Sequence, residues 1–193
     1  MRRLLYFPII HTAADMGALG ALLQRIKATR LGQQRLKHSA ELVDKMWEDI
    51  ERAVAGLALT PGQVRVYQDG LPVCAQEAQI VQELAAAGSR NHQLLLRLQE
   101  RGAVIMGTES PELLIEEYQL AHAALSAAAA GGAQRQKQQL GAALLEKRDR
   151  FMAARINRTL QSGEMGILFV GMLHSVQHYL ERDIEIKYPV KVL

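Results

Sequence analysis

The chain has 193 residues, which is long enough for one well-buried domain and short for two. Its 49% hydrophobic and 22% charged content is ordinary for a soluble globular protein, and 5% aromatics leave the core to aliphatic side chains. The net charge of +3 comes with neither a basic stripe nor interleaved aromatics, which argues against a nucleic-acid partner.

Three features of the sequence indicate the compartment of the protein. Cys74 is the single cysteine, so an internal disulfide is excluded and a reducing compartment is favoured. No run approaches the roughly 18 apolar residues that a membrane span needs. The apolar start of the chain is interrupted by Pro8 and His11, which fits a strand better than a secretion signal. We therefore expect a cytoplasmic protein with no membrane partner.

Short apolar runs flanked by turn residues predict five strands in chain order. The first, third and fourth are continuously apolar, as in strands buried on both faces, whereas the fifth alternates and is expected at an edge. Their expected ranges are 3–10, 63–67, 103–106, 166–170 and 184–188.

Helical periodicity fills the segments between these strands. A seam from Leu36 through Trp47 to Leu57 predicts one long helix over 34–57, which needs a partner helix in this chain or in a second subunit. Further helices are expected over 75–87 and 91–100, and in a helical hairpin around 111–160.

The hairpin begins with a capping signal at Ser110-Pro111-Glu112. It is expected to break at Gly131-Gly132, with Gln134–Gln139 as a disordered loop tip. The alternation of strands and helices predicts a single α/β domain over 1–193, with three layers and a mainly parallel sheet of about five strands. The strand order is not readable from the sequence.

Polar side chains follow four predicted strands, at the sheet edge where open α/β proteins bind ligands. His11, Thr12 and Asp15 follow the first strand, and His174 and Ser175 the fourth; Gln68, Asp69, Thr108, Glu109 and Ser110 follow the other two. Two imidazoles and one or two carboxylates suit Zn, Mn or Fe, so we expect His11, His174, Asp69 and Glu109 as metal ligands. Without a metal, the same groups suit general acid–base chemistry.

Each candidate also has a structural interpretation. His11 could cap a helix, Glu109 could belong to the capping turn before Pro111, and Asp69 precedes a glycine in an ordinary turn sequence. Cys74 is expected as a small core side chain, with a lesser claim as a nucleophile. The remaining histidines lie in helical stretches and are interpreted as surface or packing residues: His38, His92, His122 and His178.

The segment Arg148-Asp149-Arg150-Phe151-Met152-Ala153, followed by a strand that ends in Gly171-Met172-Leu173-His174, resembles a known pattern. It is similar to the group of TraB/Tiki, erythromycin esterase-like and ChaN-like proteins, which also place a histidine after their first strand. The resemblance covers about 30 C-terminal residues and a few around His11. It departs from the pattern in Pro8-Ile9-Ile10-His11, which lacks the expected glycine.

The resemblance implies site residues at His11, His174 and the helix pair Arg148/Asp149. In the Tiki branch such histidines and a glutamate are implicated in metal-dependent peptide hydrolysis; in the esterases related histidines serve lactone hydrolysis, and ChaN-like members bind haem iron. No glutamate here occupies an unmistakable family position, so Glu109 and Asp69 stand only as candidates.

Two functions are therefore open. One is a metal-dependent or histidine-dependent hydrolase acting on a small molecule or peptide, with catalytic roles for His11, His174 and Glu109 and with Arg148 holding an anion or transition state. The other is a non-catalytic α/β binding or scaffold module that forms a homodimer through the 34–57 helix. Nucleotide binding is disfavoured because no glycine-rich phosphate loop follows any strand.

Overall fold

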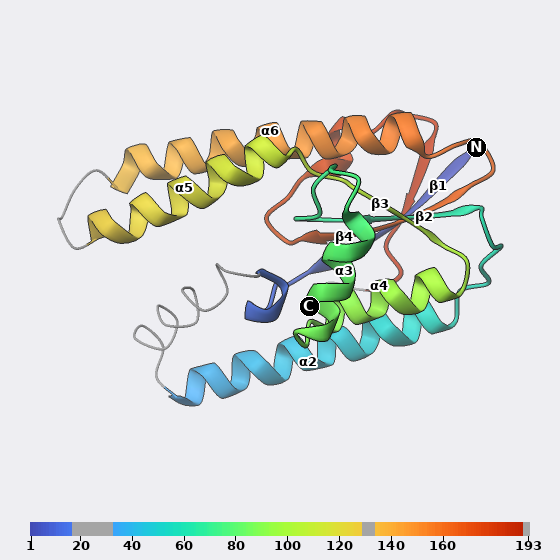
Figure 1. Cartoon of the computed structure of the whole chain (residues 1–193), viewed down its shortest axis with the longest axis horizontal. Coiled ribbons are helices and arrows are strands. Elements are labelled where there is room, and N and C mark those ends of the chain that lie inside the picture. The colour runs from blue at the N-terminus through green and yellow to red at the C-terminus, as the bar shows by residue number, and fades with distance from the viewer. Residues whose placement is uncertain (17–32, 129–133, 191–193) are drawn as a thin grey trace.

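The fold is a five-stranded, all-parallel sheet between two helical layers, as described by a computed structural model for residues 1–16, 33–128 and 134–190 (Figure 1). The strands are β1 (Arg2–Ile9), β2 (Val64–Gln68), β3 (Val104–Met106), β4 (Met165–Gly171) and β5 (Ile184–Lys187), in the spatial order β3-β2-β4-β1-β5. This confirms the predicted three-layer α/β class and places β5 at an edge.

One face of the sheet carries α2 (Gln33–Ala55), α3 (Glu77–Ala86) and α4 (Arg90–Glu100). Alternate residues of β1, such as Leu5 and Phe7, point to this face because successive strand side chains point to opposite sides. They pack with Trp47 and Val54 of α2 in one hydrophobic cluster. The long helix therefore buries its C-terminal half inside this chain.

The other face is covered by α6 (Gln134–Thr159), which pairs with α5 (Pro111–Ala128) in a hairpin that extends beyond the sheet (Figure 1). Met152 and Ile156 of α6 pack against Leu4 and Tyr6 of β1. Two short 3-10 turns complete the described elements: η1 (Ala13–Met16) and η2 (Val176–Tyr179). No helix within the described ranges has the length and apolar character needed to cross a membrane.

Two expectations are wrong, and a third lies outside the described residues. Gln134–Gln139 is the first part of α6 rather than a loop, because Gln, Arg and Lys are good helix formers and the helical segment continues without a break. Cys74 is exposed rather than in the core, since the chain turns at the surface between β2 and α3. The break at Gly131-Gly132 falls in the range that is not described.

Candidate functional site

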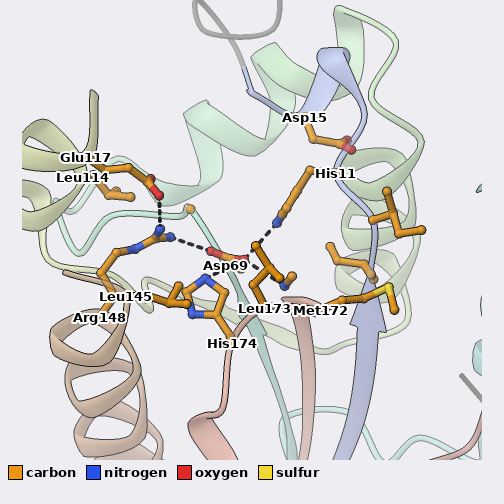
Figure 2. Close-up of a pocket in the computed structure, with 14 residues that line it drawn as sticks. His11, Asp15, Asp69, Leu114, Glu117, Leu145, Arg148, Met172, Leu173 and His174 are labelled. Carbon is orange, nitrogen blue, oxygen red and sulfur yellow. Dashed lines mark hydrogen bonds and ion pairs between the residues drawn. The ribbon is translucent and has the colours of Figure 1, made fainter. Parts of the chain in front are cut away.

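The carboxyl edge of the sheet is hollowed by a pocket of about 430 Å³ (Figure 2). Because the strands are parallel, all four predicted polar loops meet at this edge. His11 follows β1, Asp69 follows β2 and His174 follows β4, and all three line the pocket. Arg148 reaches the same point from α6. The two histidines are therefore brought together, although 163 positions of sequence numbering separate them.

Asp69 is the centre of the polar network. Its Oδ2 atom lies 2.9 Å from Nε2 of His11 and 3.3 Å from Nε2 of His174. The same oxygen accepts a hydrogen bond from the Gly171 backbone N–H at 2.9 Å. Its Oδ1 atom accepts from Nη2 of Arg148 at 2.8 Å. Both imidazoles thus contact one carboxylate oxygen.

Gly171 allows this close approach. The parallel register pairs Ile9 with Gly171, so the last residue of β4 lies directly beside the strand that leads to His11. A Cβ atom at Gly171 would lie 3.0 Å from Asp69 Oδ2 and 3.1 Å from His11 Nε2, which is tighter than ordinary contact. A side chain here would therefore force the carboxylate and the imidazole to move.

His174 is oriented by Asp149 of α6. Its Nδ1 atom lies 2.6 Å from Asp149 Oδ1, while Asp149 Oδ2 accepts the backbone N–H of Ser175 at 2.9 Å. The side chains of His174 and Asp149 are each 5% exposed. The ring is fixed by one carboxylate at Nδ1 and presents Nε2 to a second carboxylate, the arrangement that carboxylate–histidine pairs use to orient a metal ligand or a base.

Arg148 is buried among three carboxylates. Its Nε donates to Glu109 at 3.2 Å, its Nη1 to Glu117 at 2.6 Å, and its Nη2 to both Asp69 and Glu109. Burial lowers the pKa of Arg148, but the hydrogen bonds and charge of Glu109 and the charges of Asp69 and Glu117 outweigh this effect and raise it. Each guanidinium nitrogen is thus already engaged with an acid of the same chain.

Glu109 is fully buried behind Arg148 and does not itself line the pocket. The loop that carries it is tied to the β2 loop, because the Glu109 N–H donates to Leu71 and the Val73 N–H donates to Glu109. Burial raises the pKa of Glu109 to about 7, against the opposing effect of Arg148. Ser110 caps α5 by accepting the Leu113 N–H at 3.3 Å, so the capping signal and the buried acid are neighbours.

The pKa values of the histidines and of Asp69 move apart. Burial lowers the pKa of His11, but the hydrogen bond and the charge of Asp69 raise it by a larger amount. The pKa of His11 therefore lies above its usual value. Burial also lowers the pKa of His174, but the hydrogen bond to Asp149 opposes this effect, and the pKa of His174 is raised overall. Burial raises the pKa of Asp69, yet His11, His174 and Arg148 hold it well below its usual range.

A second hydrogen-bonded chain supports the turn after β1. Asp15 Oδ2 accepts from the backbone N–H and the hydroxyl of Thr12, at 2.6 and 2.8 Å. Its Oδ1 accepts from the hydroxyl of Ser89, which lies 2.6 Å from Nδ1 of His92. Burial lowers the pKa of His92 to about 4, partly opposed by the charge of Asp15. His92 is thus a buried neutral residue that anchors the turn beside His11 to the start of α4.

The structure gathers the expected site residues and adds several that sequence patterns missed. His11, Asp69, Arg148 and His174 line the pocket, with Glu109 directly behind them. The additional residues come from helices, whose contact faces depend on tertiary packing: Glu117 on α5, the Ser89–His92 pair at the start of α4, and Asp149, which only the family resemblance indicated. Cys74 is not among the residues that line the pocket.

One group of side chains in the described ranges has the spacing of a metal site. Asp69, Glu109 and His174 each offer a ligand atom, and these atoms all lie within 4.8 Å of one another. His11 lies outside that group but contacts its Asp69 oxygen. Three of the four expected ligands are therefore close enough to share one ion, with the fourth, His11, hydrogen-bonded to Asp69.

Comparison with known proteins adds no relative. No family model, curated protein or solved structure matches the chain.

Proposed function

We propose that the chain is a hydrolase that activates a water molecule at the floor of this pocket. The groups that would do so are His11, His174 and Asp69, supported by Glu109 and Arg148. The proposal is carried by one observation, the meeting of two imidazoles at a single oxygen of a buried carboxylate. Perturbed titratable groups at a pocket, at the carboxyl edge of a parallel sheet, favour a catalytic interpretation.

The contact between His174 and Asp69 favours a cation at this point. When Asp149 accepts the Nδ1 proton, a neutral His174 has only a lone pair at Nε2. That lone pair faces the Asp69 oxygen at 3.3 Å, and two lone pairs at this distance repel each other. Either a proton on Nε2 or a metal ion between the two atoms turns the repulsion into attraction.

The donor set fits a divalent metal such as Zn, Mn or Fe. Ligand atoms 2.0–2.1 Å from a tetrahedral zinc lie roughly 3.3 Å apart, which is the separation of His174 Nε2 and Asp69 Oδ2. Glu109 offers a third ligand atom, and one such atom from each of the three residues lies within 4.8 Å of the others. Imidazole nitrogens and carboxylate oxygens are the ligands that these three metals accept.

The residues of this chain would divide the chemistry among them. A divalent ion, when bound, supplies a hydroxide nucleophile by lowering the pKa of its water. His11 is the most exposed of the catalytic candidates and lies at the pocket, so it is placed to exchange protons with a small-molecule or peptide substrate. Asp69 holds His11 and receives Arg148, so it fixes both groups relative to His174.

The direct test is hydrolysis of a panel of esters and short peptides by purified protein, with and without added Zn²⁺, Mn²⁺ or Fe²⁺. We expect activity in the wild type and a loss of at least roughly a hundredfold in His174→Ala, the scale of losing a general acid–base group. His178→Ala changes an exposed histidine away from the pocket and should retain full activity. A wild type that hydrolyses nothing, or a His174→Ala variant as active as the wild type, would refute the proposal.

A further inference from the structure

We propose that the pocket selects substrates whose bound part is an apolar chain carrying a cationic group, and that it discriminates against carboxylates. That these ligands are substrates rests on the proposed function, whereas the preference of the pocket for them can be tested by binding alone. A cavity of about 430 Å³ is within the range that holds a small organic ligand.

The walls of the pocket are apolar and come from three elements (Figure 2). Leu114 of α5 and Leu145 of α6 form the hairpin side, whereas Met172 and Leu173 follow β4. Leu173 is 82% exposed and Met172 48% exposed, so both side chains have apolar surface that a ligand can cover. Covering such surface contributes about 25 cal/mol per Å² to binding.

Two acidic side chains, Glu117 and Asp15, are among the described residues that line the sides of the pocket. Glu117 projects into the pocket from α5 and Asp15 lies on the opposite side, beyond His11 (Figure 2). The Glu117 side chain is 42% exposed, whereas the Arg148 side chain is only 5% exposed and lies deeper. Among the described residues that line the pocket, a ligand therefore meets the Glu117 carboxylate before the Arg148 guanidinium.

The cationic side chains at the floor of the pocket already pair with acidic side chains of the same chain. Arg148 donates to Asp69, Glu109 and Glu117 from its three nitrogens, and His11 and His174 both face Asp69. Among the described residues lining the pocket, Arg148 is the sole Lys or Arg. A carboxylate ligand would have to compete with these acids, whereas an ammonium group would find the half-exposed Glu117 carboxylate, whose Oε1 alone is bonded to Arg148.

The test is calorimetric titration of the purified protein, freed of metal by a chelator so that octanoate cannot ligate an ion at the floor, with three ligands that share an eight-carbon chain: octyltrimethylammonium, octan-1-ol and octanoate. A quaternary ammonium cannot ligate a metal, so its binding reports on the pocket itself. We expect the ammonium to bind most tightly and octanoate most weakly, with affinity falling roughly fourfold for each methylene removed from the ammonium's chain.

Matched variants distinguish the contribution of the apolar wall to ligand affinity from that of the acidic side chain. Leu173→Asn should weaken all three ligands severalfold, whereas Leu140→Asn, at a leucine 53% exposed on α6, should not. Glu117→Gln should reduce the preference for the ammonium over octanoate severalfold. Glu116→Gln should leave this preference unchanged, since the Glu116 carboxylate lies 3.8 Å from Lys147 and does not line the pocket.

Three results would overturn the inference: octanoate binding as tightly as the ammonium, affinity independent of chain length, or no binding of any of the three. The outcome is separable from the proposed function. The expected binding order without hydrolysis would reject the hydrolase and keep the specificity, whereas hydrolysis with the reverse order would reject the specificity alone.

Discussion

Asp69 contacts both histidines of the pocket, and its removal tests the coupling between them. In Asp69→Asn the charge that raises the pKa of His11 and His174 is lost, so both pKa values should fall. NMR titration of the imidazole resonances in metal-free protein measures this directly. Asp49→Asn, which removes a carboxylate paired with Arg52 on α2, serves as the control. Histidine pKa values that do not change in Asp69→Asn would show that the three groups are not coupled.

His92 makes a separate contribution to the pH dependence of stability. Its pKa is lowered to about 4 in the folded protein, from 6.5 in the unfolded chain, so the unfolded chain binds the proton first. Above about pH 6.5, the protonation of His92 therefore does not change the free energy of unfolding. As the pH falls toward 4, it destabilises the fold increasingly. The full effect is about 3 kcal/mol, since one pKa unit is about 1.4 kcal/mol.

Replacing His92 with asparagine, which keeps a donor near Ser89, should remove that pH-dependent loss. Urea denaturation at pH 7 and at pH 4.5 gives the free energy of unfolding, and the wild type should lose more stability between the two values than His92→Asn. The exposed residue His178, changed to asparagine, should follow the wild type. Equal losses in all three proteins would rule out this role for His92.

Residues at strand ends were predictable because parallel strands bring their carboxyl ends to one edge, which is how His11 and His174 were paired from the sequence. Asp69 was recognisable as a candidate, but its central position was not, since its neighbours depend on the strand order. His92 was interpreted only as a surface or packing residue. Its hydrogen bond to Ser89 follows from the place where α4 meets the turn after β1, which periodicity does not give.

At the scale of elements, the end of β4 sets the spacing of the site. Gly171→Ala should disturb the His11–Asp69 contact and destabilise the fold by roughly 1–3 kcal/mol, the usual cost of overpacking. Gly141→Ala is the opposite case, because nothing lies within 4 Å of the added Cβ and the position is inside α6. That change should stabilise the protein by roughly 0.5–1 kcal/mol.

The free energies of unfolding from urea titration distinguish these two outcomes. If Gly171→Ala is as stable as the wild type, with its His11 pKa unchanged, the backbone at β4 does not constrain the site.

Strands were predictable to within one residue at every end because short apolar runs between turn residues have few alternatives. The beginning of α6 was not, since its Gln-rich segment lacks the apolar periodicity that marks a helix, although Gln, Arg and Lys are good helix formers. The hairpin itself was predicted around 111–160, but its place over the sheet was not. Its contribution to the pocket, through Leu114, Glu117, Leu145 and Arg148, depends on how α5 and α6 lie over the sheet edge.

For the whole molecule, the alternative function as a homodimeric scaffold places its interface on the long helix. Trp47 is 1% exposed and packs inside this chain, so it is not free to contact a second copy. Trp47→Ala should therefore cost roughly 3–5 kcal/mol of folding stability, as large-to-small core changes do. Leu42→Ala, at a leucine 43% exposed on the same helix, should cost far less.

Chemical denaturation combined with light scattering measures both stability and mass for these variants. A wild-type dimer that Trp47→Ala converts into an equally stable monomer would favour the scaffold over the hydrolase.

The central claim is that the residues at the carboxyl edge form one site that binds a divalent metal. Elemental analysis of the untagged, purified protein tests this most directly, with His11→Ala/His174→Ala as the comparison and circular dichroism to show that the variant is folded. We expect about one Zn, Mn or Fe ion per wild-type chain and none in the folded double variant. A metal-free wild type whose melting temperature is unchanged by added metal, or equal metal in both proteins, would contradict it.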